Sequence, residues 1–138
     1  MTDQALINAL NEQLNREVST FLRYMLQGAS IKGAEYEPVR QMYLQEVTDE
    51  VGHAQELANQ IVQLGGSPKL EPDLTPPPDD VDAMLKADAD AEVDDVKHYA
   101  KLAEQAGSQG LFALKLQMEE QAADEDRHGR EMRRLLGE

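Results

Sequence analysis

Glutamate and histidine residues repeat one pattern twice along the chain. The pattern is a Glu, a second Glu 33 residues later and a His three residues after that, and it occurs as Glu17, Glu50 and His53 and again as Glu92, Glu125 and His128. Only His98, among three histidines, lies outside it, and we predict a surface position for that residue. A Glu on one helix and Glu-x-x-His on the next, present twice, is a ligand set for two metal ions at the centre of a four-helix bundle.

The six residues interrupt otherwise apolar faces of four predicted helices. Residues three and four apart share one side of a helix, and Glu17 falls in line with Leu10, Leu14, Phe21 and Tyr24. Two carboxylates about 4 Å apart repel by about 4 kcal/mol at an effective dielectric constant near 20, and desolvation adds to the repulsion. No Lys or Arg lies on these faces, whereas two divalent cations balance four carboxylates. The alternative, usual for a Glu on a helix, is that the faces are solvated.

Composition narrows the class of protein. The 138 residues, with 41% hydrophobic and 4% aromatic residues, predict one all-α domain over residues 1–138. Without cysteine the chain cannot by itself build disulfides, thiolate zinc sites or iron–sulfur centres. The net charge of -14 disfavours nucleic acid and attracts cations, although an acidic surface also serves solubility alone. No leader sequence and no apolar run of about 18 residues are visible, so we expect a cytoplasmic protein without a membrane segment.

We expect helices at about residues 3–33, 36–65, 80–107 and 108–136, with Thr2 or Asp3 capping the first and Ser108 available to cap the fourth. The proline-rich stretch 65–78 is neither helix nor central strand. Extended, its 14 residues span about 43 Å, and a helix of about 28 residues is about 42 Å long. The predicted fold is therefore two antiparallel helical hairpins joined by a long crossover, with the second and third helices parallel.

Four segments, LNREVSTFLRY, TDEVGHAQEL, MLKADADAEVDD and ADEDRHGREM, resemble the bacterioferritins of the ferritin-like di-iron carboxylate superfamily. The similarity extends from the first helix through the fourth. It implies a ferritin-like four-helix bundle whose metal ligands and catalytic residues are the six of the doubled pattern. By this resemblance, Glu50 and Glu125 bridge the two irons. Glu17 and His53 complete the ligands of one iron, and Glu92 and His128 complete those of the other.

The resemblance implies ferroxidase chemistry in iron storage or detoxification, in which Fe2+ is oxidised to Fe3+ by O2 or hydrogen peroxide. Carboxylate and imidazole suit iron in both oxidation states, and the same ligands could hold Mn or Zn. Two other functions stay open. One is a rubrerythrin-like di-iron peroxidase, although a chain without cysteine has no rubredoxin domain; the other is a non-catalytic helical dimerisation module with a vestigial metal site.

Three positions depart from the bacterioferritin pattern. Val51 stands where haem-binding members have the methionine that ligates haem, so haem is not expected. Gln45 replaces the histidine of the inner-surface iron site. The sequence stops at Glu138, before the short fifth helix that lines the four-fold axis of the 24-subunit shell. We therefore expect a homodimer or another small homo-oligomer.

Five residues near the ligand set are candidates for supporting roles. Tyr24 and Tyr99 are placed either to hydrogen-bond a ligand carboxylate or supply an electron, or to be core residues with satisfied hydroxyls. Asp88 could orient a ligand histidine by accepting its second N–H. Glu46 could guide incoming metal or face solvent at the edge of the bundle, and Gln121 occupies the matching place on the fourth helix.

Overall fold

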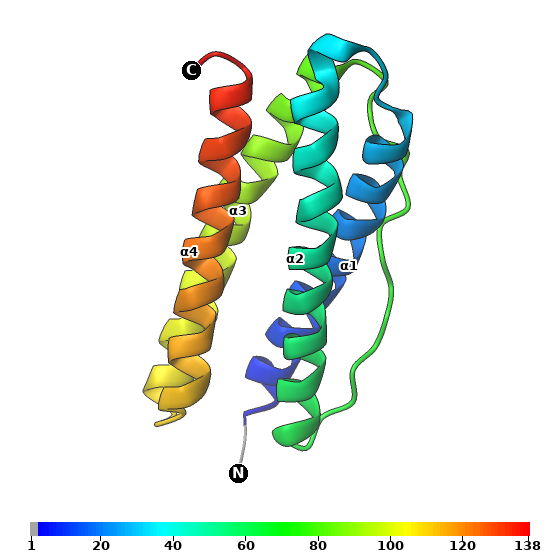
Figure 1. Cartoon of the computed structure of the whole chain (residues 1–138). Helices are drawn as coiled ribbons and strands as arrows, with labels where there is room; N and C mark the ends of the chain where they lie inside the picture. The colour runs from blue at the N-terminus through cyan, green and yellow to red at the C-terminus, as the bar shows by residue number, and fades with distance from the viewer. Residues whose placement is uncertain (1–2) are drawn as a thin grey trace.

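The computed structural model describes residues 3–138 and contains four long helices, with no strand in that range (Figure 1). They are α1 (Gln4–Ser30), α2 (Glu37–Gln63), α3 (Val81–Ser108) and α4 (Phe112–Leu135), with a short 3-10 helix, η1 (Ala34–Tyr36), before α2. α1 and α2 form one antiparallel hairpin, and α3 and α4 form the other (Figure 1). The crossover between α2 and α3 runs along the length of the bundle, so that these two helices point in the same direction. The predicted architecture, two antiparallel helical hairpins joined by a long crossover, is confirmed. None of the helices in residues 3–138 has the length and hydrophobicity needed to cross a membrane.

Side-chain caps begin α1 and α3. The carboxylate of Asp3 accepts a hydrogen bond from the backbone N–H of Ala5 at 2.9 Å, and Asp80 accepts one from Ala83 at 2.9 Å. Both satisfy backbone donors that a helix N-terminus leaves unpaired. The other predicted cap of α1, Thr2, lies outside the described residues.

The helix links differ in detail from the prediction. α1 ends at Ser30, because the chain turns at Gly33, whose φ of 103° is open to glycine but strained for other residues. The prediction that Ser108 caps the fourth helix is wrong. Ser108 is the last residue of α3, its hydroxyl donates to the carbonyl oxygen of Gln105, and α4 begins only at Phe112 without a side-chain cap.

A ladder of polar side chains on α1 holds the crossover in place. Asn11 and Asn15 each donate to one backbone carbonyl and accept from one backbone N–H of the crossover, and Ser19 accepts one more N–H; the partners are Ser67, Lys69, Glu71 and Asp73. Four residues along a helix rise about 6 Å, and two residues of an extended chain about 6.6 Å. The two repeats match, so one face of α1 satisfies alternate backbone groups of the extended segment.

Apolar side chains fill both ends of the bundle and leave a polar section between them. One cluster includes Leu10, Leu57 and Met118, and the other includes Tyr43, Leu85 and Met132. The buried acidic and imidazole side chains lie at mid-length, where the sequence predicted an interruption of the apolar faces. The fold thus places charged groups where two apolar layers shield them from water.

Candidate metal centre

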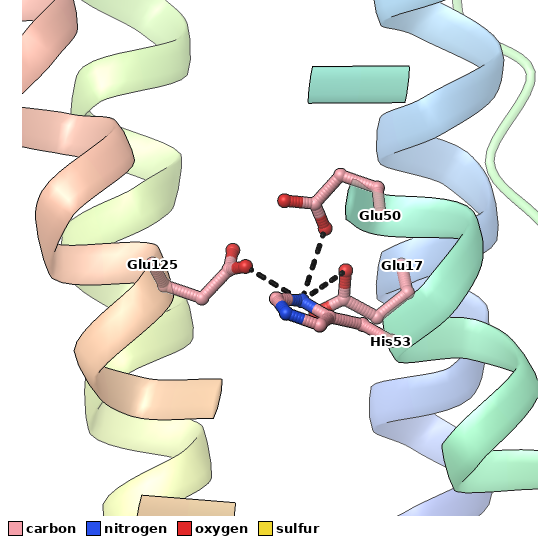
Figure 2. Close-up of side chains that lie close together, drawn as sticks. All are labelled: Glu17, Glu50, His53 and Glu125. Carbon is pink, nitrogen blue, oxygen red and sulfur yellow. Dashed lines mark ion pairs between the residues drawn. The ribbon is translucent and has the colours of Figure 1, made fainter. Parts of the chain in front are cut away.

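All six residues of the doubled pattern are buried, with exposed fractions from 0 to 7%. Their potential ligand atoms form two groups, within each of which all atoms lie within 4.8 Å of one another. The His53 group consists of Glu17, Glu50, His53 and Glu125, and the His128 group of Glu50, Glu92, Glu125 and His128. Glu50 and Glu125 belong to both groups. Figure 2 shows the His53 group, in which three carboxylates from α1, α2 and α4 surround one imidazole.

Each imidazole turns its Nδ1 toward three of the four carboxylates. His53 Nδ1 lies 2.9 Å from Glu125 Oε1, 3.8 Å from Glu17 Oε2 and 3.8 Å from Glu50 Oε2 (Figure 2). His128 Nδ1 lies 3.1 Å from Glu50 Oε1, 3.7 Å from Glu125 Oε1 and 4.0 Å from Glu92 Oε1. Nδ1 is therefore the nitrogen of each ring that faces the shared volume.

Several of these atoms are buried without a hydrogen-bond partner among the described residues: Glu17 Oε2, Glu50 Oε2, His53 Nδ1, Glu92 Oε2 and both carboxylate oxygens of Glu125. The 2.9 Å contact of His53 Nδ1 with Glu125 does not have the geometry of a hydrogen bond. An unpaired buried polar group costs about 1–3 kcal/mol, and native proteins keep few of them. Carboxylate oxygens and imidazole nitrogens aimed at one volume are donors for divalent iron, manganese or zinc. The residues therefore fit a pair of such cations.

Two arginines on α1 form ion pairs with two buried aspartates outside the doubled pattern. Arg16 Nε lies 2.7 Å from Asp95 Oδ1, and Arg23 Nε lies 2.8 Å from Asp88 Oδ1. Both aspartates are on α3 and almost fully buried. These ion pairs account for the charge of the aspartates, whereas the glutamates of the centre have no Lys or Arg partner among the described residues.

Protons and cations compete for the atoms of the centre. Burial raises the pKa of Glu92 to about 7 and holds that of Glu125 well above its ordinary value. Burial alone would lower the pKa of His128, but the nearby carboxylates of Glu46 and Glu50 raise it to about 10. Each shift reflects an excess of negative charge in a region with little water.

Tyrosine hydroxyls fix two of the carboxylates across the bundle. Tyr24 on α1 donates to Glu92 Oε1 on α3 at 2.6 Å, and Tyr99 on α3 donates to Glu17 Oε1 on α1 at 2.6 Å. The structure agrees with both alternatives left open by the sequence, because each hydroxyl bonds a carboxylate of the doubled pattern and both rings are fully buried core residues. Gln13 donates a further hydrogen bond to Glu17 Oε1 at 3.0 Å.

A family comparison agrees with this geometry. Residues 7–138 match the family described as the ferritin-like domain. The chain belongs to the ferritin-like family. A ferritin-like, diiron-carboxylate protein from Bacillus anthracis str. Ames is 34% identical, with a TM-score of 0.93 and 99% of each chain covered. A comparison with curated protein sequences gives no match.

More distant solved structures share the fold of this ferritin-like protein. The bacterioferritin of Desulfovibrio desulfuricans is 22% identical, with a TM-score of 0.87, and the match covers 96% of this chain and 78% of that one. A Dps protein from Bacillus brevis is 17% identical, with a TM-score of 0.86 and 99% of each chain covered.

Two aspartates contact the histidines of this ferritin-like centre, but neither is Asp88, the residue that we predicted for this role. Within residues 3–138, Asp88 has no histidine partner: it accepts hydrogen bonds from Arg23, Gln27 and Tyr43. His53 Nε2 instead lies 3.1 Å from Asp124 Oδ2, and His128 Nε2 lies 3.3 Å from Asp49 Oδ2. The signal was present in the sequence, because an Asp directly precedes each Glu of the Glu-x-x-His motifs.

A cavity of about 360 Å³ reaches the ferritin-like centre between α2 and α4. His128, Asp49 and Glu46 line it, and Glu46 is buried rather than facing solvent. A larger groove of about 990 Å³, between α1, α3 and the crossover, is lined by none of the six residues. His98 is exposed in that groove, as predicted. The cavity therefore opens on the His128 group from the α2–α4 side.

Proposed function

We propose that this ferritin-like chain is a ferroxidase, which binds two Fe2+ ions as substrate and oxidises them to Fe3+ in iron storage or detoxification. Two Fe2+ ions supply two electrons, which with two protons reduce O2 to H2O2, or H2O2 to two water molecules. In this proposal the same six residues bind the metal and carry out catalysis: Glu17, Glu50, His53, Glu92, Glu125 and His128. Glu50 and Glu125 would contact both ions.

The observation that carries this proposal is the convergence of unpaired buried oxygen and nitrogen atoms into two groups that share Glu50 and Glu125. A carboxylate has two oxygens and can serve two cations, whereas one imidazole nitrogen serves one. Two cations therefore match this arrangement better than one. The diiron-carboxylate description of the 34% identical Bacillus anthracis protein supports iron as the metal.

The surrounding residues suit oxidation of the bound iron. Anionic oxygen ligands stabilise Fe3+ more than Fe2+, because the attraction grows with the charge of the cation. Tyr24 and Tyr99 hold Glu92 and Glu17 in fixed orientations through their hydroxyls. The apolar layers at both ends of the bundle keep bulk water away from the reacting ions.

Anaerobic loading with Fe2+ followed by exposure to air tests the proposal. Growth of ferric absorbance with more than two irons consumed per chain is the expected result. Arrest after two irons would favour a rubrerythrin-like peroxidase, and no reaction would favour a module with a vestigial site. Glu50→Ala and Glu125→Ala should abolish oxidation, whereas the matched variant Glu120→Ala, at an exposed position of α4, should oxidise iron at the unaltered rate.

We further propose a cytoplasmic homodimer or small homo-oligomer that binds neither nucleic acid nor haem and has no membrane segment. Support for self-association comes from apolar side chains on α1 and α2 that are about half exposed, namely Met25, Leu26 and Val51. Membership of the ferritin-like family supports this location. Light scattering measures the mass of the particle, and a monomer at micromolar concentration would contradict the association.

A further inference from the structure

The two halves of the centre are related by an offset of 75 residues, and one of the buried positions at which they differ lies one turn before the shared glutamates. Glu46 on α2 and Gln121 on α4 occupy matching places, each one turn before a shared glutamate, Glu50 or Glu125. Their exposed fractions are 7% and 5%. The pseudo-symmetric bundle thus buries a carboxylate in one half where it buries an uncharged amide in the other.

Glu46 points at the His128 group. Its Oε2 lies 2.7 Å from His128 Nδ1 and has no hydrogen-bond partner among the described residues. One of its oxygens also lies within 4.8 Å of ligand atoms of Asp49 and His128, in a third group of potential metal ligands. The amide oxygen of Gln121 is buried and unpaired too, but it carries no charge. The structure therefore supplies an extra anionic oxygen beside His128.

The His128 group and the His53 group differ in the number of carboxylates near them. The His128 group contains three, and Glu46 makes a fourth, whereas the His53 group contains three and gains none from Gln121. The aspartates that contact the histidines do not alter this difference, because Asp49 and Asp124 have nearly equal side-chain exposures of 39% and 40%.

Hydrogen bonds to the unshared glutamates act in the same direction. Glu17 Oε1 accepts two hydrogen bonds, from Tyr99 and Gln13, whereas Glu92 Oε1 accepts one, from Tyr24. A donor on a carboxylate oxygen competes with a cation for its lone pairs. Glu17 is therefore expected to bind a cation more weakly than Glu92 does.

We propose that Glu46 makes the His128 group the tighter of the two cation positions and the first to fill, and that Gln121 leaves the His53 group the weaker. The difference in affinity is at least about tenfold, since a unit charge a few ångströms from a divalent ion acts strongly even at high dielectric. This inference rests on the proposed function, because it presupposes cations in both groups. The cavity between α2 and α4 opens on the group that fills first.

Crystals of the unaltered protein grown with one equivalent of Zn2+ per chain give the direct test, with anomalous scattering measured at the zinc edge. The expected result is a peak in the His128 group at least several times stronger than any peak in the His53 group. Equal peaks, or a stronger peak at His53, would overturn the ranking while leaving the proposed function intact. No peak in either group would overturn both.

Amide and acid exchanges at the matched positions give a second test in solution. Titration calorimetry with Zn2+ should resolve two affinities, of which Glu46→Gln weakens the tighter by about tenfold and Gln121→Glu strengthens the weaker by a similar factor. The double exchange E46Q/Q121E should move the single-equivalent zinc peak to the His53 group. A peak that stays in the His128 group would show that position 46 does not set the order.

Discussion

Oδ2 of Asp124 on α4 lies 3.1 Å from Nε2 of His53 on α2, so one hairpin orients an imidazole carried by the other. Asp49 and His128 repeat the relationship in reverse at 3.3 Å. Burial opposes ionisation of Asp124, yet its hydrogen bond with His53 lowers the pKa of this carboxyl below its ordinary value. An acid on the second ring nitrogen fixes the ring and raises its basicity toward a metal.

Removing this acid should weaken metal binding without removing a ligand. Asp124→Ala is expected to lower the affinity for Zn2+ by about 10–100-fold, as measured by titration calorimetry. Asp126→Ala is the matched control, because Asp126 also lies on α4 but pairs with Arg130 at the surface. Equal affinities for the two variants would contradict the orienting role of Asp124.

Neutralising a shared glutamate should raise the stability of the metal-free protein and weaken its binding of metal. Glu50→Gln removes one charge from the repelling set, and its amide oxygen can still accept a hydrogen bond from Nδ1 of His128, so the metal-free variant is expected to gain about 1–2 kcal/mol in free energy of unfolding. Zn2+ at 100 times its Kd should stabilise the unaltered protein by about 2.7 kcal/mol, and Glu50→Gln far less. Urea denaturation measures both effects. Glu120→Gln, at an exposed position of α4, should change neither quantity, and a loss of metal-free stability in Glu50→Gln would count against charge repulsion at the centre.

The metal-free protein should lose stability as the pH rises from about 5 to 8. The pKa of Glu92 is raised from 4.5 to about 7, so the folded chain retains a proton that the unfolded chain has released. The stabilisation is complete below the unfolded pKa and disappears as the pH rises through the folded one. His128, raised from 6.5 to about 10, acts with the same sign at higher pH. Urea midpoints across this range provide the measurement, and saturating Zn2+ should oppose the trend, because metal binding requires deprotonated ligands.

The crossover should depend on the side-chain ladder of α1. Asn15→Ala removes one donor and one acceptor for backbone groups of Lys69 and Glu71, with an expected loss of about 1–2 kcal/mol in stability. Limited proteolysis within residues 67–73 should become faster. Asn59→Ala, at an exposed position of α2, controls for the loss of an asparagine from a helix surface, and cleavage at the same rate in both variants would rule out the ladder.

The helices and the six convergent residues could be predicted because metal ligands and apolar faces both follow the helical repeat. Asp88 was misassigned for a physical reason: spacing along α3 places it on the correct face, but its partners, Arg23 and Tyr43, come from other helices. Contacts across the bundle depend on how α1 and α2 pack against α3, which no single helix encodes. The start of α4 was misjudged because Ser108 has the chemistry of a cap, while the chain adds a turn at Gly110 before the helix begins.

Anaerobic crystals soaked in Fe2+ and measured at the iron edge test the central claim most directly. We predict two anomalous peaks in each chain, one in the His53 group and one in the His128 group, both in contact with Glu50 and Glu125. Iron bound only elsewhere on the chain, with the carboxylates of the centre turned away from one another, would contradict the account.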